Sequence, residues 1–586
     1  MKKRTTAFLS ESLDAFLRIV RQERIFMVGV ACVIGFTVGV AAVLFKWMIF
    51  YVHDFFYNRM VYVDMDVWSV KLLWIPVALA IGGLLVGLMN HFLNPGNETG
   101  SVAEAMKWAA VDQGVVPSRV IWFRSIASAL TIGSGGSAGR EGPIVQMGAA
   151  IGSVIGRNIK ASHERIRLLC GCGTAAAIAA AFNAPLGGLI FAIEVVLGDF
   201  NIKVFSPLIF ASVIATVTAR HLEGDVPVFE LPAYTLVSTW EIVAFVALGV
   251  ICGILAAFLY KTYFMTVDIL NKLKLHPIIL PAFGGMLVGL IAIAFPDILG
   301  NGYDSMNKVL TGKMTLWIAF ALVFVKIIAT SITLGSKGSG GKFAPALFVG
   351  SMAGGAFGAA LNYFFPESVG PSGSYALVGM GAVMAAIAHA PLTNILMVFE
   401  LTNNFQVIVP IMVACISSSF VYSYFWPNSI YMEELRLRGI TLWEGREAAI
   451  MGAIKVKDVM TKEFEAIPET MPFKKIQNLI TKSKEVYFPC VDDKGKLTGV
   501  LSVQDMREFM FESGLGDLVI AKEIATDEVI SVYPDDDLNV AMDKFAIKDL
   551  DELPVIAHKP QNRVVGILKR IEVMNAYKKA VLQART

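Results

Sequence analysis

The sequence is poor in charged residues. Of its 586 residues, 17% are Asp, Glu, Lys or Arg and 55% are apolar, whereas an average globular chain carries about 25% charged residues. This composition excludes an ordinary soluble protein. Apolar runs approach or reach the roughly 20 residues that cross a bilayer, and they lie at 26–45, 72–89, 242–259, 278–294 and 407–425. The sequence therefore predicts a multi-pass membrane protein.

Other scarcities exclude further classes. The net charge is only +2 and no basic cluster contains interleaved aromatic residues, so we expect no nucleic-acid partner. None of the six cysteines has zinc-site spacing, so no metal site is expected. Cys170 and Cys172 fit small packing residues of an apolar helix better than a redox pair. The apolar part offers no nucleophile with a base, which argues against an enzyme.

Glycine-framed motifs occur twice in the chain. GSGGSAGREGP at 133–143 is echoed by GSGGKFAP at 338–345, and NAPL at 183–186 is echoed by APL at 390–392. The copies lie 202 to 206 residues apart. Repeated membrane halves with glycine-broken helices place helix N-termini near the bilayer midplane, where their free N–H groups can hold an anion. Glycines that serve only tight packing would not explain the glutamate beside them.

The same residues resemble the CLC family of chloride channels and chloride/proton exchangers over about 96–431. GREGP at 139–143 fits that family's G-[KR]-E-G-P motif, GKFAP at 341–345 fits G-x-F-x-P, and NAP at 183–185 lies between them. The resemblance implies an all-α membrane domain of two inverted repeats. It also implies a homodimer in a lipid bilayer, with one path per subunit for chloride or other small anions, and with protons as a second substrate in exchangers.

Glu141 is the sharpest single candidate, because a carboxylate among membrane helices is costly and by default functional. The resemblance gives it the role of a gate, which blocks the path when deprotonated and admits the ion when protonated or swung aside. The resemblance also makes Lys342, Phe343 and Tyr431 chloride-binding residues, with the Tyr431 hydroxyl directed at the central anion. Without the resemblance, Tyr431 would be an interfacial anchor.

Two departures from the family pattern affect anion binding. The first family signature, G-S-G-I-P, is replaced by GNETGS at 96–101. Alignment on the following residues puts Asn97 at the anion-facing serine position, which we favour, and a shifted register puts Ser101 there. Lys342 stands where the family usually has an apolar residue. It either strengthens anion attraction or snorkels towards water.

A third departure concerns protons. The internal proton-relay glutamate of well-coupled exchangers aligns with Val195, which cannot carry a proton. Glu194, Asp199 or a file of water molecules could replace it. We therefore expect chloride transport that is channel-like or weakly proton-coupled. The alternatives are a stoichiometric chloride/proton exchanger and a fluoride-selective exporter.

The tail resembles a pair of CBS domains. VYFPCV at 486–491 and GVLS at 499–502 are echoed by LPVI at 553–556 and GILK at 566–569, so strand, turn, strand and helix are expected twice. Ser502 and Asp505 fit the S/T-x-x-D feature with which many CBS domains hold a ribose, and equally fit a helix N-cap. No cofactor is required, and an adenine nucleotide is the one candidate ligand of this α/β domain pair.

The expected organisation combines these parts. It has a cytoplasmic amphipathic segment (1–24), a CLC membrane transport domain (25–435), a linker (436–453), and two CBS domains (454–515 and 516–586). The Lys- and Arg-rich N-terminus has no cleavage site and by the positive-inside rule stays in the cytoplasm. Both termini are then cytoplasmic, and a plasma (inner) membrane is the expected location.

Overall fold

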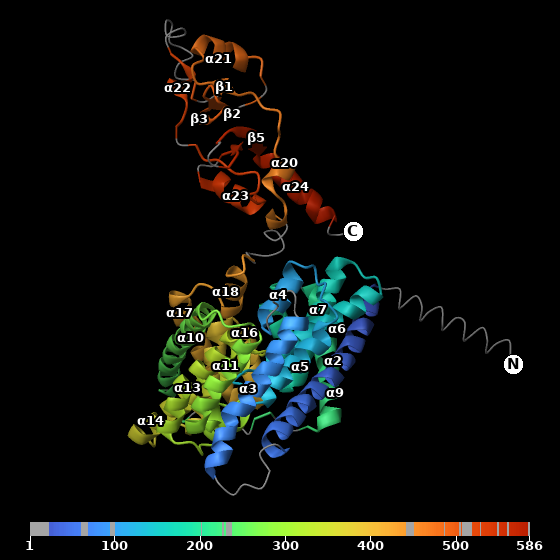
Figure 1. Cartoon of the computed structure of the whole chain (residues 1–586), viewed down its shortest axis with the longest axis vertical. Coiled ribbons are helices and arrows are strands. Elements are labelled where there is room, and N and C mark those ends of the chain that lie inside the picture. The colour runs from blue at the N-terminus through green and yellow to red at the C-terminus, as the bar shows by residue number, and fades with distance from the viewer. Residues whose placement is uncertain are drawn as a thin grey trace, which may run out of the picture. The chain divides into compact units, whose positions relative to one another are not determined.

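A computed structural model describes the chain over residues 23–59, 68–93, 100–200, 202–225, 228–229, 237–238, 240–402, 404–440, 451–483, 485, 487–502, 505–506, 519–527, 529–547, 550–558 and 562–583. The predicted N-terminal amphipathic segment (1–24) lies almost entirely outside these residues. The chain forms two compact units, Met1–Thr441 and Leu442–Thr586, which are coloured by sequence in Figure 1.

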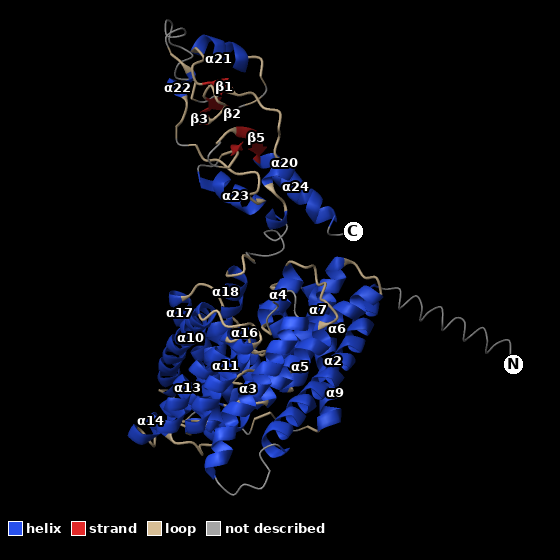
Figure 2. Ribbon diagram, viewed as in Figure 1, coloured by secondary structure: helices blue, strands red, loops and turns tan. Residues whose placement is uncertain are grey.

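The first unit is built of helices, as Figure 2 shows. Within the described residues, eight of its helices are long and apolar enough to cross a membrane, which agrees with the multi-pass prediction. The first half contains α2 (Glu23–Asp54), α3 (Trp68–Leu93), α4 (Val102–Ala110), α5 (Val120–Gly133), α6 (Glu141–Asn158), α7 (His163–Phe182), α8 (Pro185–Phe191) and α9 (Ile202–Glu223). The second half contains α10 (Glu241–Lys272), α11 (Ile279–Ala294), α12 (Tyr303–Leu310), α13 (Leu316–Gly335), α14 (Phe343–Phe364), α15 (Ser372–Ala388), α16 (Pro391–Thr402) and α17 (Ile408–Phe425), followed by α18 (Ile430–Arg436). Short turns of π-helix, η1 (Phe55–Arg59) and η2 (Ala192–Leu197), and of 3-10 helix, η3 (Pro296–Ile298) and η4 (Phe405–Val407), connect them.

The sequence repeat is a structural repeat. Helix α6 packs on α7 as α14 packs on α15, and α2 packs on α9 as α10 packs on α17, while α3 with α11 and α8 with α16 join the two halves. Equivalent glycines allow close approaches between the helices. A Cβ atom on Gly148 would lie 2.2 Å from the Gly173 carbonyl oxygen, and one on Gly350 would lie 2.1 Å from that of Gly379. The internal repeat predicted from the motifs is confirmed.

The helix ends also follow the repeat. Asn183 directly follows α7 as its C-cap, as His389 follows α15, and both residues adopt the left-handed conformation, with φ of 59° and 53°. Pro185 and Pro391 then begin α8 and α16, where a proline's missing N–H breaks no hydrogen bond. These local signals interrupt the helices inside the apolar part of the chain.

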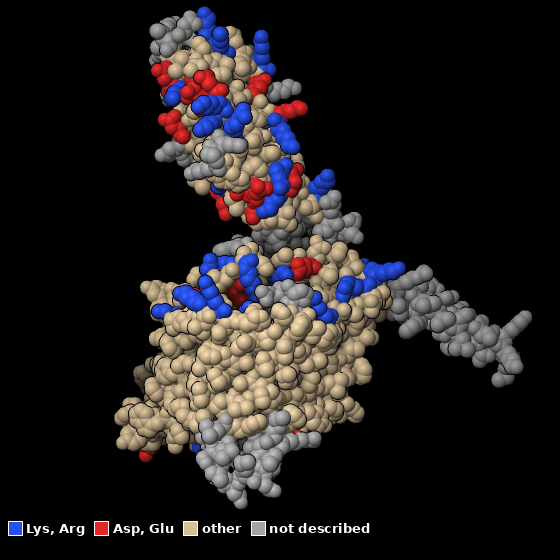
Figure 3. All heavy atoms as spheres, in the orientation of Figure 1, with Lys and Arg blue, Asp and Glu red and all other residues tan. Residues whose placement is uncertain are grey.

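The surface of this unit matches a bilayer. Figure 3 shows one face, on which a broad band is almost free of charged residues. Lys and Arg gather along one rim of that band, at the ends of the unit where α4, α7 and α18 are labelled in Figure 1. An uncharged band with charge at its edge is the pattern of a protein surrounded by lipid.

The second unit repeats a strand–turn–strand motif, as predicted. Its elements are α20 (Val456–Val459), β1 (Ile467–Pro468), α21 (Phe473–Ile480), β2 (Tyr487–Val491), β3 (Leu497–Ser502), α22 (Ala521–Ile524), α23 (Leu538–Ile547), β4 (Glu552–Ile556), β5 (Val564–Lys569) and α24 (Arg570–Gln583). Strand β1 pairs in parallel with β2, whereas β2–β3 and β4–β5 are antiparallel hairpins. The register shifts at 490/491 in one hairpin and at 555/556 in the other.

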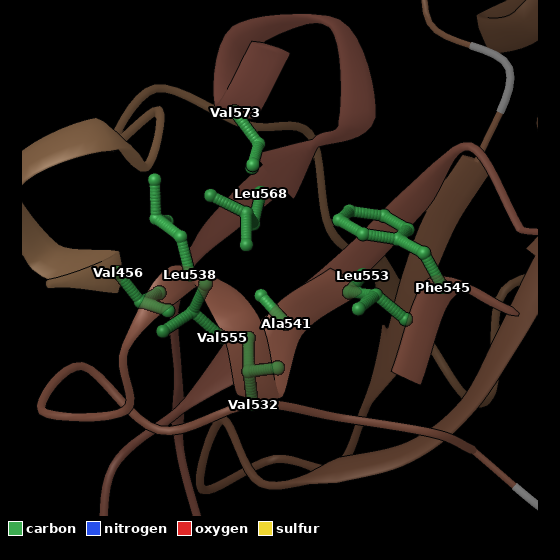
Figure 4. Close-up of a cluster of buried hydrophobic side chains, with 9 residues drawn as sticks. All are labelled: Val456, Val532, Leu538, Ala541, Phe545, Leu553, Val555, Leu568 and Val573. Carbon is green, nitrogen blue, oxygen red and sulfur yellow. The ribbon is translucent and has the colours of Figure 1, made fainter. Parts of the chain in front are cut away.

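Each copy has its own apolar core. The second core, drawn in Figure 4, gathers side chains from both hairpin strands and the flanking helices around Phe545. The first core is built in the same way around Phe473 and Phe488. Its predicted second helix falls mostly on residues 503–518, of which the structure describes only 505 and 506.

Candidate functional site

The two glycine-framed motifs meet at their backbones. The N–H of Gly139 donates to the Gly341 carbonyl at 2.8 Å, and the N–H of Gly341 donates to the Gly139 carbonyl at 2.7 Å. The N-termini of α6 and α14, which begin two residues after these glycines, are therefore held side by side. This is the juxtaposition that the repeat and the two prolines predicted.

Hydroxyl groups reinforce the junction symmetrically. The Ser137 N–H donates to Thr333 Oγ1 at 3.2 Å, and the Ser339 N–H donates to Thr131 Oγ1 at 3.0 Å. The two threonines stand 202 positions apart, as do the two serines. The halves therefore supply each other's backbone donors with acceptors where no water from bulk solvent is available.

Glu141 lies at the centre of this junction and is completely buried. Its Oε2 accepts the Ala344 N–H of the first turn of α14 at 3.2 Å, and its Oε1 accepts the Tyr303 hydroxyl at 2.6 Å. A helix N-terminus favours negative charge. The carboxylate thus occupies the position where the dipole and N–H groups of α14 would hold a free anion.

Phe343 begins α14 beside this carboxylate, and Lys342 is the N-cap residue before it. Phe343 is buried, with its ring 5.4 Å from that of Phe182. Lys342 is also buried, and its ammonium group forms a 2.5 Å ion pair with Glu434 and lies 4.3 Å from the centre of the Tyr263 ring. Its charge is thus neutralised inside the protein, which neither of the two predicted roles described.

The ion pair of Lys342 extends into a network. Glu434, on α18, also accepts from Arg438 at 3.4 Å, and Arg438 pairs with the buried Glu104 of α4. Two cations and two carboxylates therefore link α4, α14 and α18 around one end of a cavity of about 700 Å³. Ser101 and Ser339 also line this cavity.

Tyr431, in the first turn of α18, is 1% exposed, and no hydrogen bond of its hydroxyl is found within the described residues. The alternative of a lipid-facing interfacial anchor is therefore wrong. The Tyr431 hydroxyl is one of several buried polar atoms of the described residues for which no hydrogen bond is found.

Of the two candidates in the first motif, only Ser101 can be placed. Its Oγ accepts the Ala103 N–H at 3.3 Å and so caps α4. The preceding Gly100 packs against the junction, since a Cβ on Gly142 would lie 2.3 Å from the Gly100 oxygen. Asn97 lies outside the described residues.

The sequence comparisons agree with this architecture. The family described as voltage gated chloride channel matches residues 82–423. The chain belongs to this family. The CBS domain family matches 456–512 and 521–579, so the tail is a pair of CBS domains.

Known proteins of the chloride channel family resemble different parts of the chain. A ClcB-like protein of Ralstonia nicotianae is 37% identical over 355 residues, which cover 60% of this chain and 82% of the relative. A slow cyanobacterial Cl⁻/H⁺ antiporter is 26% identical with a TM-score of 0.64, over 70% of this chain and 97% of the antiporter. A eukaryotic CLC transporter, 17% identical with a TM-score of 0.61, covers 93% of this chain and 97% of its own length, and supports the fold alone.

Val195, which the family resemblance aligns with the internal proton-relay glutamate, lies in η2. Val195 is buried there. The neighbouring Glu194 accepts the N–H groups of Leu392 and Thr393 at 3.2 and 2.7 Å and the Thr393 hydroxyl at 2.6 Å. Glu194 therefore caps α16, a structural use that its position in the sequence did not reveal. Asp199 follows η2 and is half-buried.

In the tail, Ser502 and Asp505 bond to each other. Asp505 Oδ2 accepts the Ser502 N–H at 2.9 Å and the Ser502 hydroxyl at 2.7 Å, and the Asp505 N–H donates back to Ser502 Oγ at 3.2 Å. These reciprocal bonds are those expected of a helix N-cap, and the predicted helix that would follow falls mostly outside the described residues. For metals, the described residues contain no group of three His, Cys, Asp or Glu that could hold an ion.

Sequence reasoning missed Tyr303, Glu434 and the buried Lys326 of α13. The first two contact site residues more than 90 positions away, so no local pattern marks them. Lys326 did carry a signal, because a lone charge in the middle of an apolar span is functional by default.

Proposed function

We propose that the chain carries chloride across the membrane along a path between the N-termini of α6 and α14, gated by Glu141. The observation that carries the proposal is the hydrogen bond from the Ala344 N–H to the Glu141 carboxylate. Carboxylate and chloride compete for the same donors, because the field that stabilises one stabilises the other. Protonation removes the charge of the side chain and its advantage over the ion.

The transport is channel-like or weakly proton-coupled. Val195 offers no proton acceptor, and the oxygens of Glu194 already accept two N–H groups and a hydroxyl of α16. Because relatives with the same fold include an antiporter, stoichiometric chloride/proton exchange is the competing function. Fluoride export is a second alternative, since the altered first motif bears on anion preference.

Purified protein in liposomes separates these functions. Efflux of chloride, fluoride and nitrate is measured together with proton uptake, for the wild type and Glu141→Gln. We expect chloride efflux with little proton uptake, and we expect pH dependence to disappear in Glu141→Gln. Stoichiometric proton movement would reject the channel-like function, fluoride far above chloride would reject the chloride assignment, and retained pH dependence would reject the gate.

The proposal also covers the lining of the anion path, the oligomeric state, the orientation in the membrane and the ligand of the tail. Lys342, Phe343, Tyr431 and Ser101 line the anion path with the backbone of α14, and Asn97 stays a candidate. The protein is a homodimer in a plasma (inner) membrane, and the basic rim in Figure 3 faces the cytoplasm with both termini. An adenine nucleotide at the CBS pair is the one proposed ligand of the tail, with Ser502 and Asp505 at its ribose.

A further inference from the structure

Tyr303 reaches the gate carboxylate from the other half of the membrane unit. It is the first residue of α12, and its hydroxyl donates the 2.6 Å hydrogen bond to Glu141 Oε1. Hydrogen bonds to an ionised carboxylate are roughly twice as strong as those between neutral groups. The bond therefore favours the ionised side chain, in the position that blocks the N-terminus of α14.

The ring of Tyr303 is held on two sides. The Arg140 guanidinium lies 4.9 Å from its centre, and the ring of Phe229 meets it edge-on at 5.3 Å. Contacts of this kind restrict the ring to few orientations. These contacts hold the ring in the orientation in which its hydroxyl bonds to Glu141.

The backbone that delivers Tyr303 is fixed by Lys326. This residue is fully buried in α13, and its ammonium donates to the carbonyls of Ile298 and Gly300 at 2.7 and 2.9 Å. The Gly300 N–H in turn donates to the Gly135 carbonyl at 3.0 Å. Ile298 is the last residue of η3, and Gly300 lies in the short connection between η3 and α12, so both bonded carbonyls shortly precede Tyr303.

The burial of Lys326 in α13 costs free energy, so its presence calls for an explanation. Burial of an ammonium group among membrane helices is unfavourable, and the bonds that Lys326 makes in the structure are to backbone carbonyls, with the Phe348 ring 4.8 Å away. An apolar residue would pack in α13 without this cost. An apolar residue could not donate hydrogen bonds to the backbone before Tyr303, whereas Lys326 does and so fixes the position of Tyr303.

We propose that Tyr303 is a latch that keeps the Glu141 carboxylate in its blocking position, and that Lys326 is a positioning residue for this latch. The proposal rests on the proposed gating role of Glu141. Among the residues that the structure describes, the other charged or titratable groups that face Glu141 are Arg140 of the adjoining turn and Tyr431 of α18. Neither donates a hydrogen bond to the carboxylate, so Tyr303 is the side chain that bonds to the gate.

The test is the pH profile of chloride efflux from liposomes containing Tyr303→Phe. Loss of a hydrogen bond to a charged group moves a protonation midpoint by about one to two pH units. Because the lost bond favoured the ionised form, the midpoint of activation is expected to rise by that amount, with roughly tenfold or more faster efflux at neutral pH. Tyr422→Phe is the matched control, since this buried tyrosine donates to a backbone carbonyl, that of Asn428, and its removal is expected to leave the midpoint unchanged.

Double variants separate failure of the latch from failure of the gate. In a Glu141→Gln background, Tyr303→Phe is expected to change nothing further. A flat profile for Glu141→Gln together with a wild-type midpoint for Tyr303→Phe would overturn the latch and leave the gate intact. A pH-dependent Glu141→Gln would instead overturn the gate.

Lys326 is tested through Tyr303. Lys326→Gln is expected to raise the midpoint in the same direction as Tyr303→Phe, by a smaller amount, and to add nothing when the two are combined. Independent, additive shifts of the midpoint would overturn the positioning role. Thermal unfolding of each variant in detergent shows whether the variant is folded. Only the pH midpoints of folded variants are then compared.

Discussion

Glu194 and Glu400 cap helices of each other's half. Glu194 accepts N–H groups at the start of α16, and Glu400 accepts those of Leu186 and Gly187 at the start of α8, at 2.9 and 2.7 Å. The two glutamates stand 206 positions apart. A carboxylate at a helix N-terminus satisfies free donors and the helix dipole together, so this exchange joins the halves at a second place besides the glycines.

Removal of either cap is expected to lower stability by similar amounts. Glu194→Ala and Glu400→Ala each leave N–H groups without their acceptor, which costs about 2 kcal/mol. Thermal unfolding in detergent measures the loss, with Glu367→Ala, an exposed glutamate, as the control. Proton uptake in liposomes of Glu194→Ala is expected to equal that of the wild type, and its disappearance would show that Glu194 carries protons.

An added methyl group at Gly139 is expected to displace the Glu141 carboxylate from its blocking position. A Cβ there would lie 2.3 Å from Glu141 Oε2 and 3.0 Å from the Ala344 nitrogen. Gly139→Ala therefore pushes the carboxylate off the N-terminus of α14 and weakens its block, which raises chloride efflux at neutral pH. Gly29→Ala is the control, because a Cβ on Gly29 meets nothing within 4 Å. An unchanged efflux rate in folded Gly139→Ala would contradict the blocking position of the carboxylate.

Neutralisation of Glu434 is expected to strengthen anion binding. In Glu434→Gln the charge of Lys342 has lost its carboxylate partner, beside the anion-binding end of α14. A freed cation attracts halide, so we expect the half-saturating chloride concentration to fall about tenfold, with slower release, an effect of about 1.4 kcal/mol. Concentration-dependent efflux measures this change. The control is Glu433→Gln, because Glu433 is adjacent but pairs with Arg436. Its half-saturating chloride concentration is expected to equal that of the wild type.

The capping pair of the tail yields a stability test. Asp505→Asn weakens the bonds to the Ser502 N–H and hydroxyl, which is expected to destabilise the first CBS domain by about 1 kcal/mol. Limited proteolysis of the full chain follows this change, with the exposed Asp527→Asn as control. Protection of the wild type by ATP that is lost in Asp505→Asn would support the proposed ribose contact, and indifference of both proteins to ATP would reject it.

Much of the fold could be predicted from the sequence because the motifs that specify it are local and repeated. The glycine and proline positions around Glu141 and Phe343 predicted interrupted helices, and the repeat predicted that their ends meet. The repeated strands of the tail were found in the same way. In each case a short pattern dictates backbone geometry wherever it occurs.

The rest of the site depends on tertiary partners. Nothing near Lys342 in sequence indicates that Glu434 neutralises it, and nothing near Glu141 points to Tyr303, 162 positions away. The capping role of Glu194 likewise depends on α16 of the opposite repeat. Such pairings follow from packing, which the sequence specifies only through the complete fold.

The backbone bonds between Gly139 and Gly341 restrict how the protein can move. Alternating access by rocking one repeat against the other would break this pair of buried bonds, together with the exchanged threonine and glutamate contacts, in every cycle. The two halves would thus have to separate at the contacts that join them. We therefore expect ion passage to depend on rearrangements of side chains within a static frame, and we expect spin labels placed on α6 and α14 to keep one separation throughout turnover.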